Sequence, residues 1–184
     1  MKDFSRIAKR ARSWACLVIC LAVVVGGCQS KEPSLSKAAL SVKEGLLGEM
    51  GKLTAALAEP AGKRDWLAAE PILKASYEEM KKTGKFVPMG IVVLDRDGVT
   101  QDRFPPVKRA QMDFSNYAPA KSVLEEKKKT AAMLYLEGAK IFIFMAPLLH
   151  QDQVTGAVAL GFPEGELQKW RVSEKEILGI DFNQ

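Results

Sequence analysis

The sequence is poor in the residues on which catalytic and metal sites are most often built. Its 184 residues include a single histidine, His150, and three cysteines. It contains no HExxH zinc motif, no GxSxG nucleophile turn and no CxxCH haem-attachment motif. The histidine begins the stretch His150-Gln151-Asp152-Gln153, which is typical of a surface turn between two strands and is a poor place for an oriented imidazole. We therefore predict a non-enzymatic protein without a catalytic residue, a metal site or a cofactor.

Near the N-terminus the sequence lacks an apolar run long enough to cross a bilayer. The run from Trp14 to Val25 has 12 residues, whereas a membrane-spanning helix needs about 20. Five basic residues precede it, at positions 2, 6, 9, 10 and 12, and two glycines follow it. A positive head, a short apolar centre and small residues are typical of a secretory signal peptide.

The end of this run, Val25-Gly26-Gly27-Cys28, resembles the lipobox of bacterial lipoproteins. The resemblance implies that residues 1–27 are removed and that Cys28 carries the lipid. Cys16 and Cys20 lie in the removed part, so Cys28 would be the one cysteine left, and no disulfide would form within the chain. The alternative is an uncleaved anchor in which the position of Cys28 is accidental.

A lipid on Cys28 would attach the protein to the extracytoplasmic side of the cell membrane or the outer membrane. Gln29 stands where many lipoproteins retained in the inner membrane have Asp, which favours the outer membrane in a bacterium of that type. The net charge of +5 falls to +1 without residues 1–27, because 22 basic and 21 acidic residues remain. A nearly balanced charge gives no electrostatic case for nucleic-acid binding.

Three segments follow the predicted signal peptide. Residues 28–36 are polar and form the lipidated tether. Residues 37–62 have apolar positions at helical spacing and predict an amphipathic helix that ends at the Pro60 to Gly62 stretch. Residues 63–184 are expected to form the sensor domain described below. The apolar positions of the first helix are Val42, Leu46, Met50, Leu53 and Leu57.

The rest of the chain is expected to be one more long helix, then mostly strands. A helix from Asp65 to Lys82 is predicted, with Asp65 as N-cap and Thr83-Gly84 as its stop. Strands are expected over 89–94, 99–104, 132–136, 140–149 and 154–162, with a helix over 116–129 and a short capped helix from Ser173. This order predicts an α+β fold in which an antiparallel five-stranded PAS-like sheet is covered by helices.

Three segments carry a family resemblance. The run GIVVLDRDGVTQDRF, the segment DFSNYAPAKSVLEEKK and the hairpin AKIFIFMAPLLHQDQVTGAVALGF, preceded by a long amphipathic helix, resemble an extracytoplasmic Cache domain over about residues 64–165. GAF and roadblock-type domains share some of these elements, but they are chiefly cytoplasmic and fit an exported chain poorly. The resemblance implies a small-molecule ligand and a relay to a membrane signalling partner.

In Cache-type domains small ligands lie between the sheet and the loop and helix that join its halves, which here are residues 104–121. We expect this region to face Tyr135, Phe142 and Phe144. Tyr117 and Tyr135 offer hydroxyl groups, and Arg103, Lys121 or Lys140 could pair with the carboxylate of a small acid or an amino acid. For each of these residues the alternative is core packing or surface charge, and the aromatic-plus-Asp set expected of amino-acid-binding Cache domains is absent.

Strand alternation divides the side chains of 140–149 between the two faces of the sheet. Lys140, Phe142, Phe144 and Ala146 are expected on one face, and Ile141, Ile143 and Met145 on the other. A second function remains open: an interaction or scaffolding lipoprotein with no ligand pocket, which would use Leu46, Met50, Leu53 and Leu57 as its partner surface.

Overall fold

The described part of the chain folds into two long helices, a five-stranded sheet and three short helices. The structure is a computed structural model that describes residues 35–107 and 111–184, so the predicted signal peptide, Cys28 and most of the tether lie outside it. The elements are α2 (Lys37–Lys63), α3 (Trp66–Thr83), β1 (Gly90–Asp95), β2 (Thr100–Phe104), α4 (Ala118–Glu126), β3 (Thr130–Leu136), β4 (Ala139–His150), β5 (Gln153–Pro163), α5 (Gly165–Lys169) and α6 (Glu174–Leu178). The predicted α+β class is confirmed, and so is the antiparallel five-stranded sheet.

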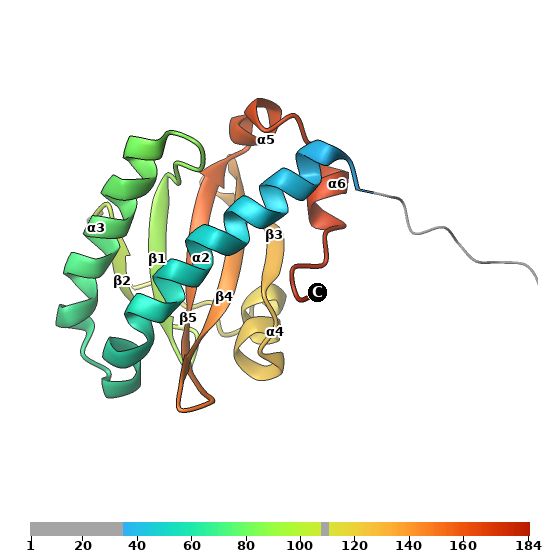
Figure 1. The fold of residues 1–184 in the computed structure, drawn as a ribbon. Helices are drawn as coiled ribbons and strands as arrows, with labels where there is room; N and C mark the ends of the chain where they lie inside the picture. Colours follow the sequence, from blue (N-terminus) through green and yellow to red (C-terminus); the bar gives the residue numbers. More distant parts are fainter. Residues whose placement is uncertain (1–34, 108–110) are drawn as a thin grey trace, which may run out of the picture. The chain divides into compact units, whose positions relative to one another are not determined.

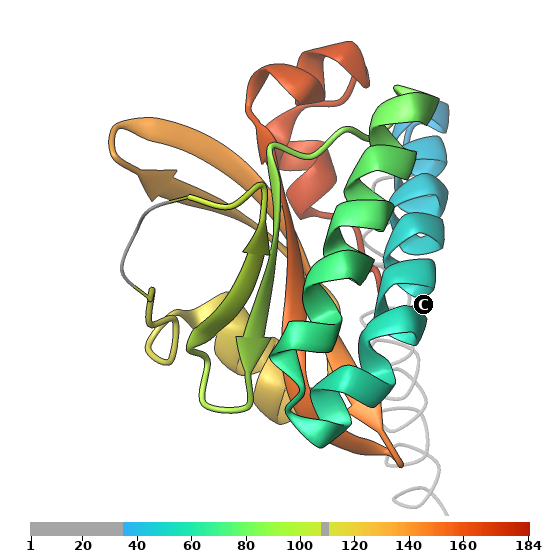
Figure 2. The same ribbon diagram turned by 90° about the vertical axis from the view of Figure 1, so that its left-hand side faces the viewer.

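The strands lie in the order β2-β1-β5-β4-β3, so the last strand in sequence occupies the middle of the sheet (Figure 1). All neighbours are antiparallel. β1, β5 and β4 are each hydrogen-bonded on both sides, whereas β2 and β3 are the edges. Viewed from the side, α2 and α3 cover one face of the sheet and α4 lies against the other (Figure 2).

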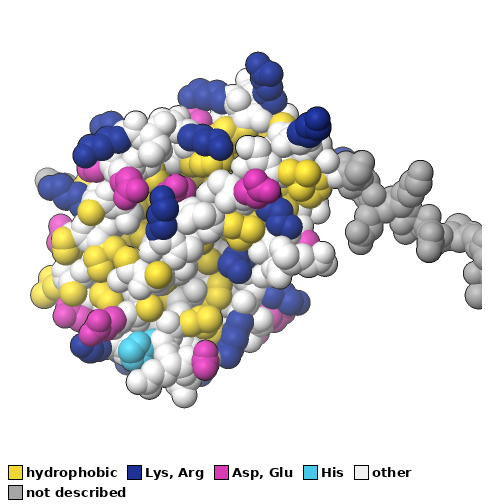
Figure 3. All heavy atoms as spheres, viewed as in Figure 1, with side chains coloured by type: hydrophobic (Ala, Val, Ile, Leu, Met, Phe, Trp, Pro, Cys, Tyr) yellow, Lys and Arg dark blue, Asp and Glu magenta, His cyan; other side chains and the backbone are white. Residues whose placement is uncertain are grey.

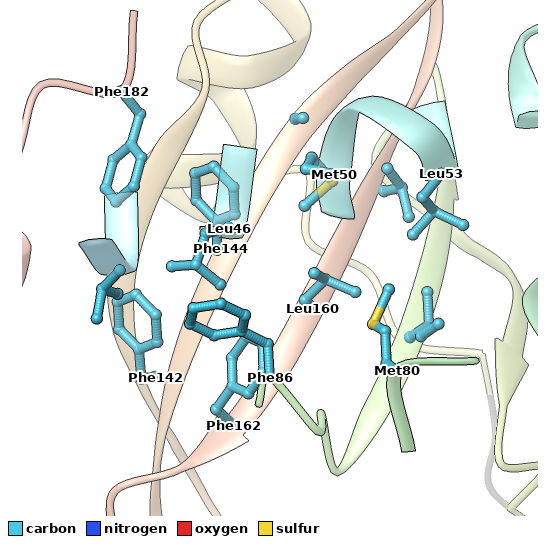
Figure 4. Close-up of a cluster of buried hydrophobic side chains, with 14 of the residues drawn as sticks. Leu46, Met50, Leu53, Met80, Phe86, Phe142, Phe144, Leu160, Phe162 and Phe182 are labelled. Carbon is cyan, nitrogen blue, oxygen red and sulfur yellow. The ribbon is translucent and has the colours of Figure 1, made fainter. Parts of the chain in front are cut away.

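The core has two parts, one on each face of the sheet. On the face covered by the long helices, Leu46, Met50 and Leu53 of α2 share one core with Phe142 and Phe144 of β4 and with Leu160 and Phe162 of β5 (Figure 4). Phe142, Phe162 and the ring of Trp170 meet at centroid distances between 5.0 and 6.1 Å. On the opposite face, Ala120 and Val123 of α4 pack with the other side chains of β4.

β4 is buried on both faces, and its alternation is as predicted. Phe142, Phe144 and Ala146 belong to the helix-side core, whereas Ile141, Ile143 and Met145 belong to the second core. A strand buried on both faces reads as a continuous apolar run, which is what IFIFMAPLL is.

The apolar stripe of α2 is wholly buried in the chain's own core. Leu46, Met50, Leu53 and Leu57 are each no more than 1% exposed. The prediction that they offer a partner surface is therefore wrong, because a helix that covers a sheet uses its apolar stripe for that purpose.

α2 ends one residue past its predicted bound of 62. Pro60 lies inside the helix, and α2 ends at Lys63 with Arg64 in the left-handed region as its C-cap. The N–H of Arg64 donates to Ala61 O, and that of Asp65 donates to Pro60 O. Ala61 is buried, so packing and these cap hydrogen bonds offset the bond that proline cannot make.

The ends of α3 are those predicted from the sequence. The Asp65 carboxylate accepts a hydrogen bond from Ala68 N at 3.1 Å, and Gly84 ends the helix with φ of 67°. α4 is shorter than predicted, because Lys127 adopts φ of 59° and turns the chain toward β3. No glycine marks that stop, so the helix end could not be predicted from the residue types there.

Charges of both signs are mixed over the face that carries α2 (Figure 3). None of the described helices is both long and apolar enough to cross a membrane.

The histidine is not in an open turn as predicted: His150 ends β4 and is half-buried against α2. A Cβ on Gly62 would lie 2.3 Å from His150 Cγ, so the glycine makes room for the ring.

Candidate functional site

A pocket of about 230 Å³ lies on the face of the sheet that the long helices leave free. Its floor is made by β1, β5 and β4, and Phe104, Pro105, Val107, Met112 and Phe114 line it from the other side. The lining residues share an apolar character, with one exception, Arg103. They are Met89, Gly90, Ile91, Val92, Leu94, Arg103, Phe104, Pro105, Val107, Met112, Phe114, Leu134, Leu136, Ile141, Ile143, Met145, Ala159 and Gly161.

Small residues in the middle of the sheet create this space. On β5, Ala157, Ala159 and Gly161 alternate with Val158, Leu160 and Phe162, and the larger set points to the helix-side core. Gly161 lies directly opposite Gly90 of β1 in the sheet register. β5 therefore presents large side chains to the long helices and small side chains to the pocket.

Larger side chains of the flanking strands wall the pocket. Ala159 has Val92 of β1 on one side and Met145 of β4 on the other. Met89 and Val107 stand at the rim, 51% and 52% exposed. An apolar floor between larger apolar walls is typical of a ligand pocket that is formed before its ligand arrives.

Of the residues predicted to bind ligand, Arg103 lies in the pocket lining and the two phenylalanines do not. Phe142 and Phe144 are fully buried on the helix side of the sheet, where they pack with Phe162 and Phe182. The prediction that they face the 104–121 region is wrong in its choice of face. Ile141, Ile143 and Met145 line the pocket in their place.

Tyr117 and Lys121 lie near the start of α4, outside the pocket lining. The Tyr117 hydroxyl donates to Met133 O at 3.3 Å, and burial raises the pKa of this phenol above its usual range. Its ring meets Phe114, which does line the pocket. Lys121 lines a separate polar groove beside Arg96, Asp97 and Glu125.

Tyr135 and Lys140 lie opposite each other beside the turn of the β3–β4 hairpin. Tyr135 is 70% exposed, and Lys140 Nζ stands 5.9 Å from the centre of its ring. Lys140 also forms ion pairs with Glu164, at 3.2 Å, and with Glu174. Hydrogen bonds to Glu174 and then Glu164 raise the pKa of Lys140, so its charge already has two acidic partners. The structure therefore separates the seven predicted residues into four places, and only Arg103 lies in the pocket lining.

The acidic residue next to Arg103 faces the other way. In the register with β1, Arg103 lies opposite Val92, which lines the pocket, and Asp102 lies opposite Val93 of the helix-side core. Burial raises the pKa of Asp102, and its Oδ2 atom has no hydrogen-bond partner. This carboxyl lies beside α3, in a shallow groove with Asp65 and Glu70.

The residues that sequence reasoning missed are the small ones of β5 and their apolar neighbours. The signal was present in AVALGF, where small and large side chains alternate strictly from Ala157 to Phe162. A central strand with small side chains on one face leaves an unfilled space on that face unless a neighbouring element fills it. Within residues 35–107 and 111–184, no group of His, Cys, Asp and Glu side chains is arranged to hold a metal ion.

Sensory and ligand-binding domains of bacterial chemoreceptors are among the solved structures that this chain resembles. The sensory domain of the Campylobacter jejuni chemoreceptor Tlp3 matches with a TM-score of 0.57 and 10% identity, covering 72% of this chain and 57% of its own. The ligand-binding domain of the Pseudomonas fluorescens chemoreceptor CtaA, in complex with L-serine, gives 0.57 and 16%, with the same coverage. The Tlp3 domain in complex with L-valine gives 0.58 and 9%, also covering 72% and 57%.

These likenesses show the fold, which is Cache-like. The chain spans a little over half the length of the matched domains. Comparison with protein-family models gives no match, and comparison with curated protein sequences gives none.

Proposed function

We propose that this chain is a small-molecule-binding extracytoplasmic sensor held at a membrane by a lipid on Cys28. The observation that carries the proposal is the pocket above Ala159 and Gly161 in a Cache-like fold. A mostly apolar concavity with one charged group at its side is a common form of ligand site. Those lining residues that the structure describes include no nucleophile and no acid–base pair, which favours binding over catalysis.

Structures of the same fold support a small ligand. The Tlp3 domain was solved with L-valine and the CtaA domain with L-serine. We propose that this chain likewise binds one small molecule.

A thermal-shift screen of the purified protein against small acids, amino acids, amines, alcohols and nucleotides tests the proposal. A ligand at about 100 times its dissociation constant adds about 2.7 kcal/mol of stability. For a chain of this size that corresponds to a rise in the unfolding temperature of several degrees. A panel without any stabilising compound would contradict the proposal.

Filling the pocket ties the effect to this site. Ala159→Leu adds three carbon atoms above the pocket floor and should remove the ligand-induced shift. Ala131→Leu makes the same change on an edge strand, on the helix-side face, and should keep the shift. Equal responses in both variants would mean that the ligand binds elsewhere.

The lipid anchor is proposed from the sequence alone, since Cys28 lies outside the described residues. Cys28→Ala should abolish incorporation of labelled palmitate and release the protein from membranes. Cys20→Ala changes a cysteine in the predicted signal peptide and should leave the label in place. If the Cys28 variant stays membrane-bound, the segment from Trp14 to Val25 is a true anchor instead.

The bound state would then reach a membrane partner through the surface of this domain. α2 begins next to the tether and packs over β4 and β5, the same strands that carry the pocket on their other face. Crosslinking in native membranes should therefore capture a partner from α2, and the yield should change on adding ligand. The same yield with and without ligand would exclude a relay by this route.

The competing function, a scaffolding lipoprotein without a pocket, would need another surface. Leu46, Leu53 and Leu57, which would have formed that surface, are buried in the core between α2 and the sheet. Leu53→Asp would accordingly unfold the domain rather than release a partner from a folded one.

A further inference from the structure

We infer that the pocket takes a compact apolar molecule that carries no ammonium group, and that it rejects α-amino acids. The inference rests on the proposed function, because it names the ligand class of the same pocket. It departs from what the amino-acid complexes of the same fold suggest by analogy.

The side chains around the pocket offer nothing to an ammonium group. Among the described residues that line it, Arg103 has the only charged or polar side chain, and a guanidinium repels a cation. A buried ammonium needs a carboxylate or several acceptors to replace its water. No Asp or Glu belongs to the described lining.

The backbone of the strands that form the pocket floor is also already hydrogen-bonded within the sheet. β1 is bonded to β2 and β5, and β4 is bonded to β5 and β3, so the carbonyl groups beneath the pocket belong to sheet ladders on both sides. At the edge strand, Met133 O accepts the Tyr117 hydroxyl. A ligand amine would have to compete with these bonds.

The acidic residue that comes closest in sequence is turned away by strand geometry. Asp102 precedes Arg103 on β2, so the two side chains lie on opposite faces of the sheet. Asp102 lies beside α3, with Asp65 and Glu70. A shift of one residue in the register of β2 would have put this carboxylate into the pocket.

The volume sets the size of the molecule. The pocket measures about 230 Å³. A dry apolar cavity of about 150 Å³ in another protein binds benzene, so this pocket has room for one short branched chain or a substituted ring. Its apolar walls, which include Ile141, Ile143 and Met145, suit the hydrocarbon part, and the rim near Arg103 suits a neutral or anionic end.

Four molecules with one branched carbon skeleton separate the charges. Isohexanol is neutral, isocaproate has one carboxylate, isohexylamine has one ammonium group, and leucine has both. Isothermal titration calorimetry of the purified protein should give isohexanol or isocaproate a dissociation constant at least about tenfold below those of isohexylamine and leucine. Ala159→Leu should remove this binding, and Ala131→Leu should keep it.

The outcomes distinguish the inference from the proposed function. Leucine or isohexylamine binding as tightly as isocaproate overturns the inference and leaves the sensor proposal standing. An amino acid emerging as the best ligand of the thermal-shift screen does the same. Absence of binding in the four titrations and in the whole screen overturns both.

Discussion

The backbone N–H of Ser36 donates to Oε1 of Glu176 at 3.1 Å, across 140 residues of sequence. Ser36 is the N-cap of α2, and Glu176 lies in the first turn of α6. The side chain and then the backbone N–H of Ser36 lower the pKa of Glu176 below its ordinary value. The C-terminal segment is therefore fastened to the point where the chain leaves the tether.

Replacing this carboxylate should destabilise the domain in a pH-dependent way. Because the pKa of Glu176 is lower in the folded state, its contribution is complete above the ordinary value of 4.5 and is lost as the pH falls through the folded value. Glu176→Gln should therefore lower the unfolding temperature at pH 7, and the gap to the wild type should close below about pH 4.5. Glu125→Gln, an exposed change on α4, is the control, and a gap that persists at low pH would disprove the role given to the charge.

The three interior glycines of α2 should respond to alanine with opposite signs. A Cβ on Gly45 would lie 2.1 Å from Cε2 of Phe86, whereas Gly48 and Gly51 have nothing within 4 Å. The Phe86 ring is buried and packs edge-on against Trp170, so it has little room to move.

Gly48→Ala and Gly51→Ala should each stabilise the protein by about 0.5–1 kcal/mol, since alanine favours the helix and reduces the freedom of the unfolded chain. Gly45→Ala should destabilise it, because the cost of displacing the Phe86 ring exceeds that gain. Chemical denaturation of the three variants checks the signs. Stabilisation by Gly45→Ala would mean that the α2–Phe86 contact is looser than described.

The aromatic residues once assigned to the ligand should instead hold the helix-side core. Phe142→Ala removes a fully buried ring that meets Phe162 and Trp170, and should cost about 3–5 kcal/mol of unfolding free energy. Phe142→Leu keeps most of the buried area and should leave a folded protein that still binds ligand. Loss of ligand affinity in the folded Leu variant would restore Phe142 to the site.

The alternation of side chains on β4 was predictable from the sequence, but the face that borders the pocket was not. IFIFMAPLL is apolar at almost every position, and a strand buried on both faces does not show which set of side chains lies under the long helices. The strict alternation of small and large residues in AVALGF of β5 would have identified the pocket face. That pattern predicts a gap on the face of the small residues, where Ile141 and Ile143 are found.

The ends of α2 and α3 were predicted closely, whereas the end of α4 was not. Asp65 and Gly84 bound α3 as expected, since each acts through local chemistry. α4 ends at Glu126 because Lys127 adopts φ of 59°, at a place where neither glycine nor proline marks a stop. Four of the predicted ligand-binding residues lie outside the pocket: Tyr117, Lys121, Tyr135 and Lys140. Their positions likewise depend on strand register and ion pairing, which no local sequence pattern encodes.

Methyl resonances on the two faces of the sheet offer the most direct test of the central claim that the pocket above Ala159 holds the ligand. With isoleucine, leucine and methionine methyl groups labelled, addition of a stabilising ligand should shift the signals of Ile141, Ile143 and Met145, which line the pocket. The signals of Leu46, Leu53 and Met80 in the helix-side core should stay in place (Figure 4). Shifts confined to the helix-side methyl groups, or absent from both faces while the ligand is bound, would contradict the claim.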